Sequence, residues 1–394
     1  MTVLADPVPG TGDPGATTPV LDRESARAFV LRHVAPGAAE FERAAAVPES
    51  VLQQMSAAGL WAPFLPAAVG GAGLPMTAVG EIHEEVGRGC SSVRSLLTVH
   101  SMLSWTVARW GSDEQKSRWL PDLAAGTLLG AFCLSEPDAG SDATGIRTTA
   151  TPDGTGWRLD GTKTWITGGM RADLLLVFAR LGAGIGAFLV SADAPGVRRR
   201  PLPEVMGTRG SMIAEITFTD VALGADALLG PSGFTAGMVL TGTLDIGRFS
   251  VACGSVGIIQ ACLDASAAHA ARRRVGGVLV KDLQLVQAKL TDMVTDVRAA
   301  RLLCQEAGRL KDLGDSSTLM ATWVAKYFAS TAAARHASEA VQIHGALGMT
   351  DRTPVARLYR DAKVMEIIEG SNEVQRTTIA AEAFRAADLP AAGS

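Results

Sequence analysis

The sequence predicts an α+β fold in which a helical segment, a β segment and a second helical segment follow one another. Residues 21–130 and 237–385 carry apolar side chains at three- and four-residue spacing, whereas residues 131–236 show short runs with period two. No alternation of strands and helices interrupts this order, and 394 residues suffice for two or three domains. We therefore expect an N-terminal helical domain, a central antiparallel β-sandwich or barrel, and a C-terminal four-helix bundle.

The first helices are expected at residues 51–60 and 93–110, where Pro and Gly separate the apolar patterns. In the β segment, a strand at residues 157–161 should enter a tight turn and continue at 163–167. Further strands are expected over three short runs, residues 174–179, 187–190 and 213–221.

A glycine-rich stretch at residues 182–186 loosely resembles a dinucleotide-binding loop, but no helix follows it, which favours a hairpin turn. Long helices should return at residues 283–313 and 316–345. Residues 1–20 and 386–394 are expected to form tails, the first of them mobile because it contains few large apolar groups.

Composition argues against several classes of protein. The chain is 47% hydrophobic and 19% charged, which is typical of a globular protein, and its net charge of −4 argues against nucleic-acid binding. No apolar run approaches the ~20 residues that span a bilayer, so we expect neither membrane association nor a secretory signal. The five Cys lack CxxC spacing and the six His lack HExxH pairing. They predict buried thiols in a reducing cytoplasm and no metal site.

Glu369 is the most informative residue of the chain. It follows Ile367 and Ile368 and precedes Gly370, whose backbone freedom permits a bend. A carboxylate beside apolar neighbours is harder to ionise, so its pKa should rise toward that of a useful proton acceptor. The alternative is a surface glutamate near a helix end.

Five stretches, in this order, resemble the acyl-CoA dehydrogenase family across roughly residues 21–385. They are Leu134-Ser135-Glu136-Pro137-Asp138-Ala139-Gly140-Ser141-Asp142, Gly161-Thr162-Lys163-Thr164-Trp165-Ile166-Thr167, Gly207-Thr208-Arg209-Gly210-Ser211, Val341-Gln342-Ile343-His344-Gly345, and residues 359–376. The resemblance implies FAD as cofactor, a homodimer or homotetramer, and a separate electron acceptor.

Residue by residue, the resemblance implies two groups of FAD contacts. The ring and diphosphate would meet one protomer, through Phe132, Leu134, Ser135, Gly140, Ser141, Trp165 and Thr167, with Ser371 and Glu373 near the adenosine diphosphate. A neighbouring protomer would add Arg273, Gln284, Gln342 and Gly345. This chain departs from the family at Gly276, where an aromatic residue usually follows the arginine, so a solvated basic face remains an alternative for Arg272–Arg274. For Trp165 the alternative is a half-buried strand aromatic.

The resemblance makes Glu369 the catalytic base. Some relatives place the base just before the arginine of the Leu244-Asp245-Ile246-Gly247-Arg248 segment, but Gly247 cannot abstract a proton. Glu369 would remove the proton next to a thioester carbonyl while a hydride passes to flavin N5. The backbone N–H of the base and a ribityl hydroxyl would stabilise the developing enolate oxygen.

The segment from Gly89 to His100 resembles the helix that lines the acyl end of the family's cavity. Residues 94, 98 and 101 share one helical face, and here they are Arg94, Thr98 and Ser101. An unpaired guanidinium does not suit an alkyl tail, so Arg94 is expected to meet an anion or polar oxygen. The alternative is an arginine that turns outward or pairs with Glu84 or Glu85. Substrate contacts are expected from Arg94, Ser95, Thr98, Asp245, Arg248 and Gly370.

The Cys-Ser-Ser-Val-Arg-Ser motif at residues 90–95, together with residues 361–371, resembles a subgroup of the family. These are acyl-ACP dehydrogenases encoded with polyketide synthases, which help to make hydroxymalonyl-ACP and hence methoxymalonyl extender units. A small oxygenated acyl group on an acyl carrier protein is therefore expected. The alternatives are a catabolic short-chain acyl-CoA dehydrogenase, a flavin oxidase or monooxygenase on the same fold, and a non-catalytic scaffold.

Overall fold

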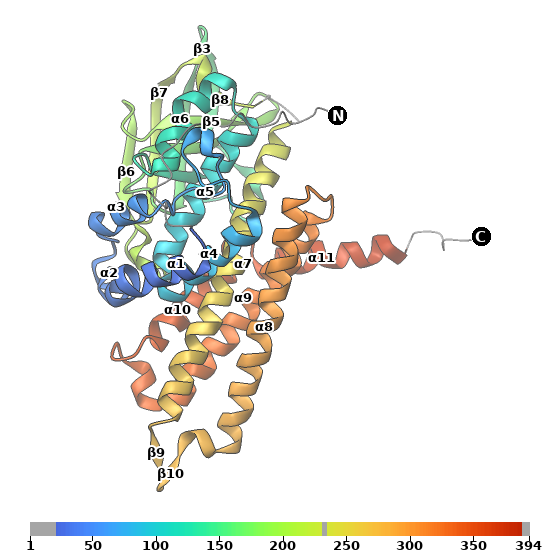
Figure 1. The fold of residues 1–394 in the computed structure, drawn as a ribbon. Coiled ribbons are helices and arrows are strands. Elements are labelled where there is room, and N and C mark those ends of the chain that lie inside the picture. Colours follow the sequence, from blue (N-terminus) through green and yellow to red (C-terminus); the bar gives the residue numbers. More distant parts are fainter. Residues whose placement is uncertain (1–20, 231–234, 388–394) are drawn as a thin grey trace, which may run out of the picture.

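The computed structural model describes residues 21–230 and 235–387, and within them the order of helical, β and helical segments is confirmed (Figure 1). The expected tail at residues 1–20, and residues 388–394 of the second tail, lie outside the described residues. Residues 386 and 387 belong to the last helix rather than to a tail.

The N-terminal part is helical, and its two longest helices, α4 (Met76–Gly89) and α5 (Ser91–Trp110), are largely buried. Asp22 caps the first helix and Ser112 the last, each through a reciprocal capping box that satisfies free backbone N–H groups. The helix α5 includes the segment expected at residues 93–110. The helices are α1 (Arg23–Phe29), α2 (Ala38–Ala44), α3 (Glu49–Ala57), α4 (Met76–Gly89), α5 (Ser91–Trp110) and α6 (Asp113–Ala125).

The β segment forms one sheet in the order β6-β7-β3-β2-β4-β5-β8, with β1 beside β4. Its pairs are antiparallel except that β1 and β2 run parallel to β4. The turn expected after residue 161 is absent: β3 runs through Gly161 with only a shift in register, whereas the hairpin at residues 182–183 is confirmed. The strands are β1 (Gly130–Cys133), β2 (Thr149–Asp153), β3 (Gly156–Ile166), β4 (Leu174–Leu181), β5 (Gly184–Ser191), β6 (Val197–Pro201), β7 (Ala214–Leu223) and β8 (Leu228–Leu229).

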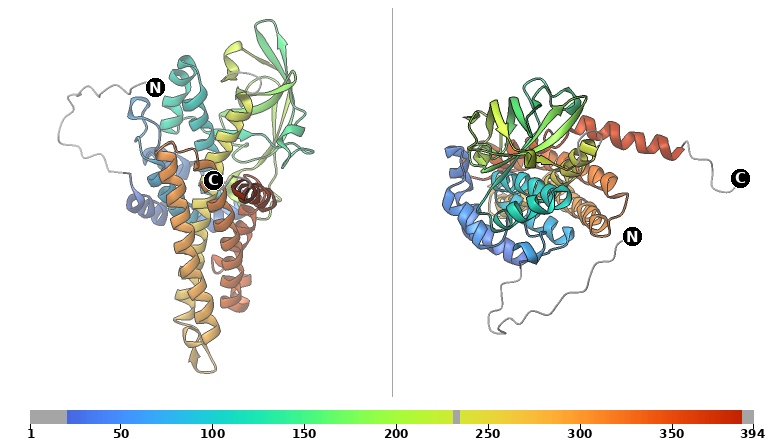
Figure 2. Two further views of the ribbon diagram at one scale, coloured as in Figure 1. Left: turned by 90° about the vertical axis from the view of Figure 1, so that its right-hand side faces the viewer. Right: turned by 90° about the horizontal axis from the view of Figure 1, so that it is seen from above.

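The C-terminal part is helical, and its two longest predicted helices are confirmed as α8 and α9. A short hairpin of β9 (Arg274–Val275) and β10 (Val278–Leu279) lies at the end of the bundle that is farthest from the large sheet (Figure 1). The helix α11 extends away from the rest of the protein (Figure 2). The helices are α7 (Thr235–Ala270), α8 (Gln284–Asp312), α9 (Thr318–His344), α10 (Val355–Met365) and α11 (Asn372–Ala387).

The helix α7 is the central element of the fold. It packs against α9, α4 and α5. The expectation that no apolar segment is long enough to span a bilayer is corrected here, because Gly237–Ala270 is long and apolar enough by length and composition. However, 83% of that apolar window is buried inside the protein, as expected for a core helix. It runs antiparallel to α5: Thr98 contacts Ser250, and Thr106 contacts Thr243.

Candidate active site

Glu369 lies in a left-handed turn between α10 and α11. Its φ is +56° and that of Gly370 is +92°, a conformation that costs a non-glycine residue about 1–3 kcal/mol. The turn directs the carboxylate onto α7 at Gly247. A Cβ on Gly247 would lie 2.4 Å from Oε2 of Glu369 and 2.8 Å from the sulfur of Met102. Glycine at position 247 therefore creates the space that the carboxylate occupies.

Three side chains hold the turn through its carbonyl groups. Arg248 Nε donates to the carbonyl oxygen of Glu369 at 3.0 Å, and Lys326 Nζ donates to that of Gly370 at 2.8 Å. Gln375 Nε2 donates to both oxygens, at 3.3 and 3.1 Å. Arg248 also lies over the ring of Trp323, 4.2 Å from its centroid. These hydrogen bonds together stabilise the strained backbone conformation and hold the base in one position.

Burial makes the Glu369 carboxyl a base suited to neutral pH. Its Oε2 is inaccessible and has no hydrogen-bond partner among the described residues. Burial raises the pKa of Glu369 to about 7, although the positive charges of Arg248, Lys326 and Arg94 lower it. The predicted direction is confirmed, but the predicted cause is wrong in part, because the side chain of Ile367 is 59% exposed. The packing of α7 and α5 around the carboxylate supplies the burial instead.

Lys326 is a site residue that the sequence analysis missed. It is buried in α9, where it also donates to Oδ1 of Asn372, and burial lowers its pKa to about 7. The structure places Lys326 on the same helical face as Thr322 and Ala329, both fully buried. A lysine on a face of small buried residues is unusual unless it has partners.

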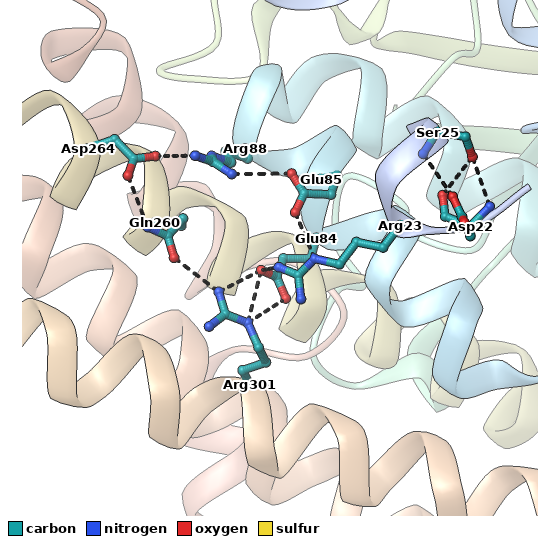
Figure 3. A network of polar contacts seen from close by, with 9 residues as sticks. All are labelled: Asp22, Arg23, Ser25, Glu84, Glu85, Arg88, Gln260, Asp264 and Arg301. Atoms are coloured by element: carbon teal, nitrogen blue, oxygen red, sulfur yellow. Dashed lines mark hydrogen bonds and ion pairs between the residues drawn. The ribbon is translucent and has the colours of Figure 1, made fainter. Parts of the chain in front are cut away.

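Arg94 is fully buried, and its alternative partners are engaged elsewhere. Glu84 pairs with Arg23 and Arg301, and Glu85 pairs with Arg23 and Arg88, in a network that joins α1, α4, α7 and α8 (Figure 3). Neither an outward-turned Arg94 nor a pair with these two carboxylates is therefore found. Burial lowers the pKa of Arg94 to about 10, while the negative charges of Asp361 and Glu369 raise it. The guanidinium stays charged at neutral pH.

The contacts of Arg94 leave part of its donor capacity unused. Nη1 donates to Oγ1 of Thr98 at 3.1 Å, and Nη2 lies 2.8 Å from the sulfur of Met365, which is a weak acceptor. Nε is buried without a hydrogen-bond partner in the described part of the chain. The side chain lies against Gly254, where a Cβ would be 2.8 Å from Cδ and Nε. The geometry thus suits an additional oxygen ligand.

The structure separates the other predicted substrate residues. Arg248 and Gly370 belong to the turn around Glu369, whereas Asp245 forms a buried ion pair with Lys311. Thr98 lies on the same face as Arg94, and Ser101 follows one turn later. The hydroxyls of Ser95 and Ser101 are buried without partners among the described residues.

One group of predicted cofactor residues lies together around Trp165. Its φ is +60° and its side chain is 61% exposed at the end of β3, so the half-buried alternative is wrong. The backbone N–H of Thr164 donates to Ser135, and Lys163 Nζ donates to the carbonyl of Leu134, which fixes the neighbouring loop. Gly140 and Ser141 are exposed on that loop, and Phe132 and Thr167 are half-buried. An exposed indole beside a loop with accessible N–H groups fits a planar ring that carries a phosphate.

The second group lies at the opposite end of the bundle (Figure 1). Arg273, Gln284, Gln342 and Gly345 are all exposed. A cavity of about 490 Å³ there is lined by Arg272, Arg273, His344 and Leu347, among others. Gly276 and Gly277, in the left-handed region, form the β9–β10 turn, which explains the missing aromatic residue. One protomer therefore does not bring these residues to Trp165. Ser371 and Glu373 lie two and four residues after the base, where α11 begins.

Comparison with known proteins agrees with this geometry. The N-terminal, middle and C-terminal domains of acyl-CoA dehydrogenases match residues 21–127, 131–221 and 231–384. The human mitochondrial short-chain specific acyl-CoA dehydrogenase is 36% identical over 92% of this chain and 89% of its own length.

Two solved structures are informative. FkbI, for biosynthesis of the methoxymalonyl extender unit of the Fk520 polyketide, is 36% identical with a TM-score of 0.85, over 94% of this chain and 100% of its own. A glutaryl-CoA dehydrogenase from Mycobacterium smegmatis in complex with FADH2 is 30% identical with a TM-score of 0.87, over 94% and 95%. The chain therefore belongs to the acyl-CoA dehydrogenase family and is an FAD-dependent dehydrogenase of acyl thioesters.

Proposed function

We propose that this enzyme oxidises a short acyl thioester that carries oxygen at its far end, on an acyl carrier protein that supplies polyketide extender units. The observation that carries the proposal is the buried, incompletely bonded guanidinium of Arg94, which lies one to two helical turns from the base along α7. The electrons would pass on to a separate acceptor, and the oligomer would complete each cofactor site with residues from two chains.

Glu369 supplies the proton acceptor of the reaction. Its pKa of about 7 leaves a large fraction ionised at neutral pH, while burial keeps that carboxylate poorly solvated and hence reactive. The fixed turn at residues 369–370 aims it at one substrate carbon. When bound, FAD would supply the hydride acceptor, so that the substrate could lose one proton to Glu369 and one hydride. Trp165, Thr167 and Ser135 would hold the ring, and Ser141 the diphosphate.

The distance between base and guanidinium limits the acyl group. Glu369 contacts α7 at Gly247, and Arg94 is bonded to Thr98, which meets α7 at Ser250. Three residues of α7 separate Gly247 from Ser250, but Cδ and Nε of Arg94 pack at Gly254, seven residues from Gly247, so the guanidinium lies about 4.5 to 10 Å from the base along the helix axis. Only a few carbon atoms fit between a proton-losing carbon and an oxygen on Arg94. A three-carbon oxygenated acyl group satisfies both ends, and the likeness to FkbI supports a carrier-protein thioester.

The second candidate is a catabolic short-chain acyl-CoA dehydrogenase. This chain is 36% identical both to the human short-chain enzyme and to FkbI, so sequence identity supports the two candidates equally. Carrier and acyl group must therefore be tested separately.

The deciding experiment uses four substrates: glyceryl and butyryl groups, each on acyl carrier protein and on CoA. Each is mixed anaerobically with the FAD-loaded enzyme, and the absorbance of oxidised flavin is followed. We expect fastest bleaching with glyceryl-ACP. Butyryl-CoA as the best substrate would establish the catabolic alternative.

Two variants connect the result to the site. Arg94→Leu should lose about 10–100-fold in kcat/KM with the glyceryl group, the value of a charged hydrogen bond, and much less with butyryl. Equal losses in kcat/KM with the two acyl groups would show that Arg94 has only a structural role. Glu369→Gln should keep FAD yet abolish bleaching with every substrate.

A further inference from the structure

A buried chain of hydrogen bonds lies behind Arg94 and links α4, α7 and α5. His83 Nδ1 lies 2.6 Å from Oγ of Ser250, which lies 2.5 Å from Oγ1 of Thr98. Thr98 accepts from Arg94 Nη1 at 3.1 Å. The four residues are at most 3% exposed, so water does not compete for these bonds. Arg94 and Thr98 were expected from the sequence to be site residues, whereas His83 and Ser250 were not.

The protons of this chain can be ordered in only one way that satisfies every contact. Oγ1 of Thr98 lies 2.8 Å from the carbonyl oxygen of Arg94, which can only accept, so the single proton of Thr98 is used there. Ser250 must then donate its proton to Thr98. His83 must donate from Nδ1 to Ser250.

His83 is neutral in this arrangement. Burial and the positive charge of Arg94 lower its pKa to about 3. Nε2 is the unprotonated nitrogen, and it is buried without a partner among the described residues. The histidine thus acts as a fixed donor rather than as a titrating group.

This order has a consequence for Arg94. The hydroxyl of Thr98 gives its proton to a carbonyl and accepts from both Arg94 and Ser250, so it has no capacity left for a substrate. Its role is to hold Nη1 of the guanidinium. Of the remaining donors of the guanidinium, Nε has no partner among the described residues, and Nη2 donates to the sulfur of Met365, which a substrate oxygen can replace as the acceptor.

We propose that His83 is a specificity-determining positioning residue: through Ser250 and Thr98 it fixes the Arg94 guanidinium at the far end of the acyl group and so selects oxygenated acyl groups. The inference rests on the proposed function. Packing alone does not explain this series of hydrogen bonds. Burying the polar side chains of His83, Ser250 and Thr98 is costly where apolar side chains would fill the same volume. The bonds among them are required only if the orientation of Arg94 matters.

The test uses paired variants that remove or retain one donor or hydroxyl. His83→Leu and Thr98→Val break the chain, whereas His83→Asn keeps an N–H donor and Thr98→Ser keeps the hydroxyl. Ser266→Ala is the matched control, since this buried serine of α7 has no hydrogen-bond partner in the described residues. For each, kcat and KM are measured with glyceryl and butyryl groups on the carrier that the wild type prefers.

We expect the glyceryl-over-butyryl preference to fall about tenfold in Thr98→Val, which removes a buried hydrogen bond to a charged group, and about fivefold in His83→Leu, which removes a neutral one. The loss should lie mainly in KM for the glyceryl substrate. His83→Asn, Thr98→Ser and Ser266→Ala should stay within about twofold of wild type.

The outcomes separate the two claims. A wild type without preference for the glyceryl group would refute the proposed function. A wild type whose preference is lost in Arg94→Leu but retained in both His83→Leu and Thr98→Val would overturn the positioning role alone. If His83→Leu does not fold, the comparison of Thr98→Val with Thr98→Ser decides.

Discussion

Replacing Glu369 with Gln should make the folded enzyme more stable, and increasingly so as the pH rises. The unfolded carboxyl ionises near its ordinary pKa of 4.5, whereas the folded one ionises near 7. Stability is therefore lost as pH rises from 4.5 to 7, because the folded state retains a proton that the unfolded state has released. The difference between the two pKa values corresponds to about 3 kcal/mol above pH 8 and about 1 kcal/mol at pH 5. Gln cannot ionise and avoids this cost.

The assay is the thermal unfolding of wild type and Glu369→Gln, both loaded with FAD, between pH 5 and pH 8.5. At about 2.1 cal/mol/K per residue, 394 residues give an unfolding entropy of about 0.8 kcal/mol/K. The difference in Tm should grow from about 1 °C at pH 5 to about 4 °C at pH 8.5. Glu306→Gln, at an exposed carboxylate beside Arg309, is the control and should show no such growth. A difference in Tm that is independent of pH would refute a buried, titrating Glu369.

Three further perturbations follow from the site and its scaffold. Gly247→Ala should lower both kcat and Tm, at a cost of about 1–3 kcal/mol, because its Cβ overlaps the carboxylate of Glu369; unchanged values would place that carboxylate elsewhere. Lys326→Met should shift the midpoint of the kcat–pH profile upward, since the lysine charge lowers the pKa of Glu369, and a downward shift would contradict this. Lys163→Met leaves Glu136 buried without its cation and should cost about 3–5 kcal/mol in urea unfolding; a loss below about 1 kcal/mol would show the pair to be dispensable.

The sequence predicted the elements whose apolar period is long and regular. The helices α8 and α9 begin and end within two residues of expectation, and all five cysteines are buried thiols. The turn predicted at Gly161 was wrong, because a glycine with φ of +147° inside a strand has the same local sequence signature as a glycine in a turn. Only the pairing of β3 with β7 distinguishes the two.

The site residues that stand in local sequence motifs were predicted, whereas those that depend on distant partners were not. Glu369, Gly370 and Trp165 stand in motifs, and the buried carboxylate oxygen of Glu369 and the exposed indole of Trp165 match their expected roles. Lys326 and His83 could not be assigned, because their partners lie 44 and 167 residues away in the sequence. Contacts across such separations depend on how α7, α9 and α4 pack.

The close approach of Gly247 and Glu369 has an evolutionary consequence. The two positions share a single volume, so a homologue with a larger residue at the equivalent of 247 should have a small one at 369, and the reverse. Migration of the base from this turn to α7 would then require two coordinated substitutions, with either intermediate overcrowded or lacking a carboxylate. Such covariation should be visible wherever enough homologous sequences are aligned.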